Sequence, residues 1–155
     1  MLAELLNPDA VLLHYSAHDA EDVVRQLSEK LLNRGYVRES FADAALAREA
    51  EMPTGLMLGG DINVAIPHTD VEHVIRPAVA MATLKKPVTF RHMIDPTEEV
   101  PVQIVFLLAL EQPKSQVAML QEVASVLQNA ELLEQLIQCV DVDKIKNLLA
   151  EHHIS

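Results

Sequence analysis

The stretch Val102–Leu110 limits the possible folds more than any other part of this sequence. It reads VQIVFLLAL, so that Gln103 is its only polar residue. A strand that is apolar on both of its sides is typical of the centre of a sheet covered on both faces. The sequence therefore predicts a layered protein in which this strand is central and helices pack against the sheet.

The length of the chain favours a single domain over residues 1–155, large enough to bury a core without disulfides or a structural metal. Its one cysteine, Cys139, has no partner for an internal disulfide. No apolar run reaches the roughly 18–20 residues of a membrane span. The first residues lack the basic segment and apolar core of an export signal. We therefore expect a cytoplasmic protein.

The net charge of −11 at pH 7 narrows the class of partner. A protein that binds a phosphate backbone needs a basic surface, and one that stacks on bases needs aromatic side chains, whereas Trp is absent here. The composition therefore argues against a nucleic-acid partner. An acidic surface instead favours encounter with a basic protein.

Two helices are predicted before the first buried strand. One begins at Ser16, where Asp19 takes the place of the usual Glu or Gln of a capping box, and it ends at Gly35. The second begins at Ser40, which also has an acidic residue three positions later. It ends before Pro53, because the residue that precedes a proline avoids the helical conformation.

The remaining elements are strands in the middle of the chain and helices in its last third. Besides 102–110, the strand candidates are Asn63–Ile66, Ala78–Leu84 and Val88–Phe90. The helix candidates are a segment from Pro113 to Leu127, one over about Glu131–Cys139, and a last one from Asp141 to Leu149. This order indicates an α/β (α+β) layer structure with a mixed central sheet.

The best candidate for a functional residue follows the short apolar run at 64–66. Pro67 ends that strand and places His68 at the exposed end of a rigid element. Upstream, Arg48 and the loop that contains Thr54 could place a guanidinium group and a hydroxyl group beside His68. A histidine beside an arginine that binds anions suits transient phosphoryl transfer.

Three sequence elements, in this order, resemble a known family: Ala47-Arg48-Glu49, Pro53-Thr54-Gly55 and Val64-Ala65-Ile66-Pro67-His68. Together they resemble the fructose–mannitol type (type 2) of IIA domains of the sugar phosphotransferase system (PTS). The run REAEMPTGLML at 48–58 is similar to the galactitol-specific branch. The resemblance covers essentially the whole chain. It implies the type-2 IIA fold, with a mixed central sheet of about five strands flanked by helices.

The resemblance also implies a phosphotransferase function, that of a phosphocarrier. In this family the histidine that matches His68 accepts a phosphoryl group on Nε2 from phospho-HPr, a small basic protein, while a backbone carbonyl holds Nδ1. The group then passes to a cysteine of the cognate IIB, and the membrane component IIC is reached only indirectly. The arginine that matches Arg48 contacts the phosphoryl oxygens. No metal or cofactor is implied, because the donor is already a phosphohistidine.

Two further residues are predicted to stabilise the phosphoryl group. Thr54 offers a hydroxyl donor. Many family members carry a second histidine at the start of the helix after the long apolar strand, and Gln116 aligns with it here. An amide donates a hydrogen bond but carries no charge, so the helix N-terminus would add backbone N–H groups and positive dipole. The glutamine, and a longer loop before His68, resemble the galactitol branch.

Other interpretations remain open at this point. A nitrogen-type regulatory IIA, which controls other proteins according to its phosphorylation state, has the same fold. A histidine after a strand is often an ordinary surface or core residue, and Arg48 suits a salt bridge on a helix face. His68, Asp70 and His73 suggest a metal cluster, but their spacing is not that of a zinc site and no Cys or Glu-x-x-His partner accompanies them.

Overall fold

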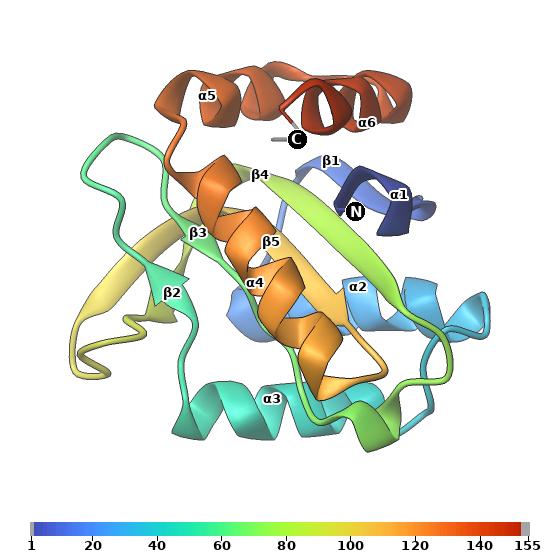
Figure 1. The fold of residues 1–155 in the computed structure, drawn as a ribbon. Helices are drawn as coiled ribbons and strands as arrows, with labels where there is room; N and C mark the ends of the chain where they lie inside the picture. Colours follow the sequence, from blue (N-terminus) through green and yellow to red (C-terminus); the bar gives the residue numbers. More distant parts are fainter. Residues whose placement is uncertain (1, 153–155) are drawn as a thin grey trace.

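A five-stranded mixed sheet in the order β1-β4-β5-β3-β2 forms the middle layer of the protein (Figure 1). The computed structural model describes residues 2–152, without the side chains of residues 113–116. The strands are β1 (Leu6–Tyr15), β2 (Gly55–Leu56), β3 (Val64–Ala65), β4 (Ala78–Arg91) and β5 (Glu99–Ala109). The helices are α1 (Leu2–Leu5), α2 (Ala20–Asn33), α3 (Phe41–Glu51), α4 (Pro113–Leu127), α5 (Ala130–Gln138) and α6 (Val142–Glu151), and a 3-10 turn, η1, covers Val71–His73.

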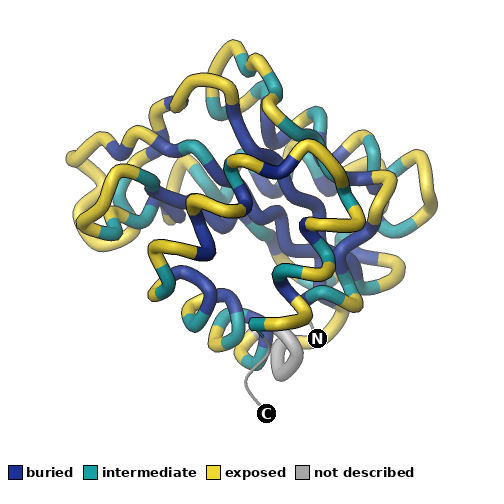
Figure 2. The backbone as a smooth tube through the Cα atoms, turned by 90° about the horizontal axis from the view of Figure 1, so that it is seen from above, coloured by how far each residue is buried: buried dark blue, intermediate teal, exposed yellow. Residues whose placement is uncertain are grey.

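The central strand β5 has a buried core on each of its faces. Val105 and Leu107 join the core that includes residues of α2 and α3. Phe106 and Leu108 alternate with them and join the core of α4, α5 and α6. Because successive strand residues point to opposite faces, a nearly continuous apolar run is what this position requires. The buried residues, dark blue in Figure 2, run through the middle of the molecule. The predicted layered fold and central strand are therefore confirmed.

Two predicted strands form one element, and two strands were not predicted. Ala78–Leu84 and Val88–Phe90 belong to β4, whose pairing with β5 shifts between Thr83 and Val88. The bulge takes up Lys85-Lys86-Pro87, which are exposed and interrupt the apolar pattern. The edge strand β1 escaped prediction because Asn7-Pro8-Asp9 breaks its pattern. The edge strand β2 has only two residues.

The helix ends differ from the predicted capping boxes at two places. Asp19 itself is the N-cap of α2, and its side chain accepts a hydrogen bond from the Asp22 N–H at 2.8 Å. Ser40 precedes α3 as predicted, but its side chain does not cap the helix. Gly35 follows α2 with a positive φ of 78°, as expected for a glycine that ends a helix.

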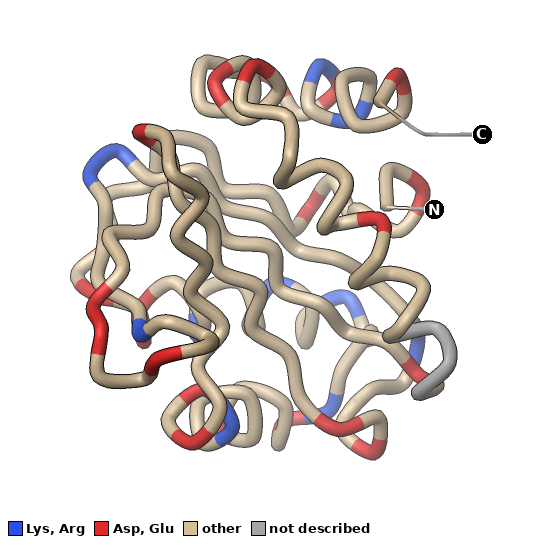
Figure 3. Tube along the Cα trace, turned by 60° about the vertical axis from the view of Figure 1, so that its left-hand side comes forward, with Lys and Arg blue, Asp and Glu red and all other residues tan. Residues whose placement is uncertain are grey.

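The charged residues lie on the helices and outer loops, while the middle of the sheet is almost free of charge (Figure 3). Since acidic residues outnumber basic ones, the surface is acidic overall. None of the described helices combines the length and the apolarity that crossing a membrane requires.

Gly55 brings strand β2 close to the end of β4, and we expect Gly55→Ala to destabilise the fold. An added Cβ would lie 2.5 Å from the backbone oxygen of Arg91 and 3.2 Å from Cβ of Phe90. The backbone must therefore shift, which we expect to lower the free energy of unfolding by about 1–3 kcal/mol. Urea denaturation of the variant and the wild type measures this difference.

Gly60→Ala is the matched control for this prediction. Position 60 has open space around an added Cβ and its φ is not positive, so the same chemical change meets no obstacle. Its free energy of unfolding should stay within about 0.5 kcal/mol of the wild-type value. Equal stability of both variants would show that β2 tolerates displacement from β4.

Candidate functional site

His68 lies beside the end of the central strand. The residue before it, Pro67, accepts a hydrogen bond through its carbonyl oxygen from the Leu108 N–H at 3.0 Å, and His68 pairs with Leu108 in parallel. Because β3 and β5 are parallel, their carboxyl ends share one edge of the sheet, and α4 begins at Pro113 beyond that edge. Such edges are where open α/β sheets hold their ligands.

The His68 ring has one nitrogen committed and one available. Nδ1 lies 2.9 Å from the carbonyl oxygen of Ile66. A carbonyl oxygen only accepts hydrogen bonds, so Nδ1 must carry the proton in the neutral ring. The lone pair is then on Nε2, the nitrogen that the resemblance assigns to the phosphoryl group. Ring orientation and tautomer are both set by the main chain.

The surroundings of His68 favour its neutral form. Burial lowers the pKa of the imidazole, and the positive charge of Arg48 lowers it further. The hydrogen bond to the Ile66 carbonyl and the negative charge of Asp70 act in the opposite direction. The net direction is downward from the ordinary value of 6.5. A neutral imidazole is the form of histidine that has a free lone pair and can act as a nucleophile.

We expect His68 to titrate below pH 6.5 in an NMR titration of the histidine ring protons, because the pKa is lowered mainly by burial. Removing the nearby cation in Arg48→Gln should raise the midpoint. Removing the nearby anion in Asp70→Asn should lower it further. A wild-type midpoint at or above 6.5, or shifts in the reverse directions, would contradict this description of the site.

Arg48 reaches the site from the last turn of α3. Its Nη1 lies 3.4 Å from Oδ1 of Asp70, two residues after His68, and this pair is the weak, partly solvated kind. Its Nε is buried without a hydrogen-bond partner among the described residues. The guanidinium group is near enough to His68 for its charge to lower the pKa of the imidazole, and the side chain is 32% exposed. A partly exposed guanidinium group in a weak ion pair is suited to bind an incoming anion.

Thr54 lies close to the same segment, but its hydroxyl group is already occupied. The side chain is buried, and Oγ1 donates to Oε1 of Glu49 at 2.8 Å. Oγ1 also accepts a hydrogen bond from the Ile66 N–H at 3.2 Å. Gln116 belongs to the first turn of α4, but its side chain lies outside the described residues, so its predicted role stays a prediction.

The three residues of the possible metal cluster have other partners. Nδ1 of His73 is 2.8 Å from Oγ of Ser40, and Asp70 pairs with Arg48. Within the part of the chain that the structure describes, no three His, Cys, Asp or Glu side chains form a group that suits a metal ion.

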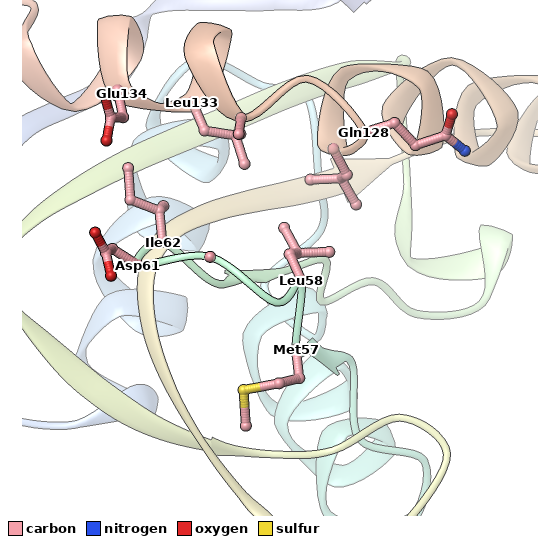
Figure 4. Close-up of a pocket in the computed structure, with 10 residues that line it drawn as sticks. Met57, Leu58, Asp61, Ile62, Gln128, Leu133 and Glu134 are labelled. Carbon is pink, nitrogen blue, oxygen red and sulfur yellow. The ribbon is translucent and has the colours of Figure 1, made fainter.

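An apolar cavity of about 350 Å³ lies away from His68, between the loop after β2 and the junction of α4 and α5. Leu58, Ile62 and Leu133 point into it, and Asp61 and Glu134 stand at one end (Figure 4). It is at the C-terminal end of α4, whereas the end of β5 next to His68 leads into the N-terminal end of that helix. The cavity is therefore separate from the candidate site.

Glu49 and Asp70 contact the candidate site residues, although from the sequence Glu49 was given no role and Asp70 was considered only as part of a possible metal cluster. Both oxygens of the Glu49 carboxyl group accept hydrogen bonds from Thr54. A negative charge in the last turn of a helix interacts unfavourably with the helix dipole. The position of Glu49 in the last turn of α3 therefore indicated that its carboxyl group has another partner. For Asp70 the signal was a charge two residues after the candidate histidine.

A family model matches residues 4–152, described as "Phosphoenolpyruvate-dependent sugar phosphotransferase system, EIIA 2". Among curated proteins, the galactitol-specific EIIA component of Escherichia coli (strain K12) is 32% identical over 119 residues. The match covers 77% of this chain and 78% of that protein.

Solved structures of IIA proteins have the same fold. The mannitol-specific cryptic enzyme IIA CmtB from Escherichia coli superimposes with a TM-score of 0.76 at 20% identity, covering 97% of this chain and 98% of the other. A complex of the Escherichia coli mannitol enzyme IIA with phosphorylated enzyme IIB gives a TM-score of 0.72 at 25% identity, covering 94% and 97%.

Proposed function

Because the chain belongs to the EIIA 2 family of the phosphoenolpyruvate-dependent sugar phosphotransferase system, we propose that it carries a phosphoryl group on Nε2 of His68. Members of this family are phosphotransferase components of sugar uptake systems. The observation that carries the proposal is the 2.9 Å contact of Nδ1 with the Ile66 carbonyl, which leaves the lone pair on Nε2.

The proposed step needs no base at His68. The Nε2 lone pair attacks the phosphorus atom while the P–N bond of the donor phosphohistidine breaks, and the donor imidazole takes back the electron pair. Nε2 carries no proton before the reaction, so none has to be removed from it. In phosphoryl transfer the protein supplies mainly position and charge stabilisation.

Arg48 supplies the charge stabilisation in this proposal. Its weak 3.4 Å contact with Asp70 is readily exchanged for the more highly charged phosphoryl group. A planar guanidinium group binds two phosphoryl oxygens at once, which an ammonium group does less well. Asp70 repels the phosphoryl group and takes Arg48 back after the group has left.

The roles of Thr54 and Gln116 differ in what supports them. The hydroxyl proton of Thr54 is donated to Glu49, which favours a role in positioning over direct contact with the phosphoryl group. For Gln116 we keep the proposal that its amide and the N-terminus of α4 assist the phosphoryl group. It rests on the resemblance and on the start of α4 at Pro113.

We propose phospho-HPr as the donor and a cysteine of a cognate IIB as the acceptor, both in the cytoplasm. The acidic surface favours a basic donor protein. The structural similarity to a IIA that forms a complex with phosphorylated IIB supports the second partner. The galactitol-specific relative favours sugar or polyol transport, galactitol in particular, over the nitrogen-type regulatory function.

The test is incubation with phosphoenolpyruvate, enzyme I and HPr, followed by mapping of acid-labile phosphate and addition of a galactitol-type IIB. We expect one phosphoryl group on His68 and its transfer to the IIB cysteine. Labelling of another residue would overturn the assignment of the site. Labelling of His68 without transfer to this IIB or to those of other sugars would favour the regulatory function.

A further inference from the structure

Glu49 holds Thr54 with both oxygens of its carboxyl group. Oε2 accepts a hydrogen bond from the Thr54 N–H, and Oε1 accepts one from the Thr54 hydroxyl, each at 2.8 Å. Glu49 is in the last turn of α3, next to Arg48, and Thr54 is in the loop that leads to β2. The pair therefore ties the loop to the helix.

Thr54 in turn holds the backbone of Ile66. The Ile66 N–H donates to Oγ1 of Thr54 at 3.2 Å and to the Thr54 carbonyl oxygen at 3.3 Å. Because the hydroxyl proton points to Glu49, the lone pairs of Oγ1 remain available for the Ile66 N–H. Glu49 therefore determines the direction in which the Thr54 hydroxyl group acts.

Ile66 completes a connection from Glu49 to the imidazole. Its N–H is bound by Thr54, and its carbonyl oxygen accepts the hydrogen bond of His68 Nδ1. These two groups of Ile66 belong to different peptide bonds, so the connection is mechanical and does not run through one polarised amide. A displaced Ile66 would move the acceptor that sets the tautomer of His68.

We propose that Glu49 is a positioning residue for His68, acting through Thr54 and the backbone of Ile66 to keep the proton on Nδ1 and the lone pair on Nε2. The inference rests on the proposed function, since it concerns the same phosphoryl acceptor. Burial raises the pKa of Glu49, and the two hydrogen bonds from Thr54 counteract the rise. The burial of a carboxyl group at this place is compensated by the contacts that hold Thr54.

Glu49→Gln is the sharpest variant because it keeps the size of the side chain. Glutamine has one oxygen acceptor, whereas Thr54 presents two donors, so one of them faces an amide NH₂ group. Thr54→Val removes the hydroxyl group with little change of shape, and Thr54→Ser retains it. Glu134→Gln, on an exposed residue of α5 next to the separate cavity, is the matched control.

The readouts are the ¹⁵N shifts of the His68 ring, which report the tautomer, and the rate of labelling by phospho-HPr at saturating donor. In the wild type, Thr54→Ser and Glu134→Gln, we expect the Nδ1–H tautomer and undiminished rates. In Glu49→Gln and Thr54→Val, we expect a mixture of tautomers and rates reduced roughly ten- to a hundredfold, as for a misplaced reacting group.

Unchanged ring shifts in a folded Glu49→Gln would overturn the inference, whatever its rate. If that variant does not fold, as judged by its amide NMR spectrum, the comparison of Thr54→Val with Thr54→Ser decides. A slower Thr54→Val with the wild-type tautomer would mean that Thr54 contacts the phosphoryl group directly, against the inference. The proposed function fails separately, if the wild-type protein takes no label at His68.

Discussion

Replacing His68 by alanine is expected to abolish the uptake of phosphate from phospho-HPr. The variant lacks the only group that we propose as the acceptor, so no residual transfer at this site is possible. The fold should survive, because the main-chain contacts of Pro67 and Ile66 with Leu108 and Thr54 do not involve the imidazole. Incorporation of labelled phosphate and the melting transition measure the two effects.

His73→Ala is the control for this loss. His73 is a neighbouring histidine in η1 whose Nδ1 lies against Ser40, and it has no role in the proposed step. The His73→Ala variant should take up labelled phosphate at the wild-type level. If His68→Ala is labelled as well as the wild type, the acceptor is another residue and the proposed site is wrong.

Replacing Arg48 by alanine is expected to slow transfer by roughly a hundred- to a thousandfold, as for the loss of a main electrostatic donor, on the order of 2.7–4 kcal/mol. The reason is that the variant lacks the guanidinium group that we propose to stabilise the transferred phosphoryl group. Arg48→Lys keeps the charge and loses the planar fork, so we expect a loss of roughly ten- to a hundredfold. Rapid-quench measurement of labelling by phospho-HPr gives these rates.

Two observations separate this role from a structural one. The Arg48 variants should keep nearly the wild-type free energy of unfolding, because the ion pair with Asp70 is partly solvated and weak. Glu51→Gln, an exposed change in the same helix, should leave the rate nearly unchanged. Unchanged transfer together with a large loss of stability in Arg48→Ala would assign Arg48 to the fold instead.

The sequence predicted the central elements of the fold well because their patterns are local. An all-apolar strand at Val102–Leu110 and the helix that begins at Pro113 both follow from the residues themselves. The edge strand β1 did not follow, because the polar residues and the proline of Asn7-Pro8-Asp9 break its apolar pattern and its pairing depends on β4, far along the chain. Edge strands are defined by their neighbours more than by their own pattern.

At the site, the sequence predicted which reactive residues lie near one another better than it predicted the hydrogen bonds around them. The motif led to His68 and Arg48, and the structure brings them close enough for the charge of Arg48 to lower the pKa of His68. The sequence predicted that the Thr54 hydroxyl group stabilises the phosphoryl group. In the structure this hydroxyl group donates a hydrogen bond to Glu49 and accepts one from the Ile66 N–H. The direction of these hydrogen bonds depends on how the segments of Glu49, Thr54 and Ile66 meet in space. A pattern of residues along the sequence does not predict it.

The acceptor of the His68 Nδ1 proton is a main-chain oxygen, and this has a consequence for how the site can be lost by mutation. Every amino acid at position 66 brings the same carbonyl group, so no substitution there deletes the acceptor itself. A side-chain carboxylate in the same place would be removed by a single codon change. A mutation that removes this contact must instead displace the backbone of Ile66, which is the effect that we propose for changes at Glu49 and Thr54, outside the strand. The tautomer of His68 is thus determined by the path of the main chain and does not depend on the side chain at position 66.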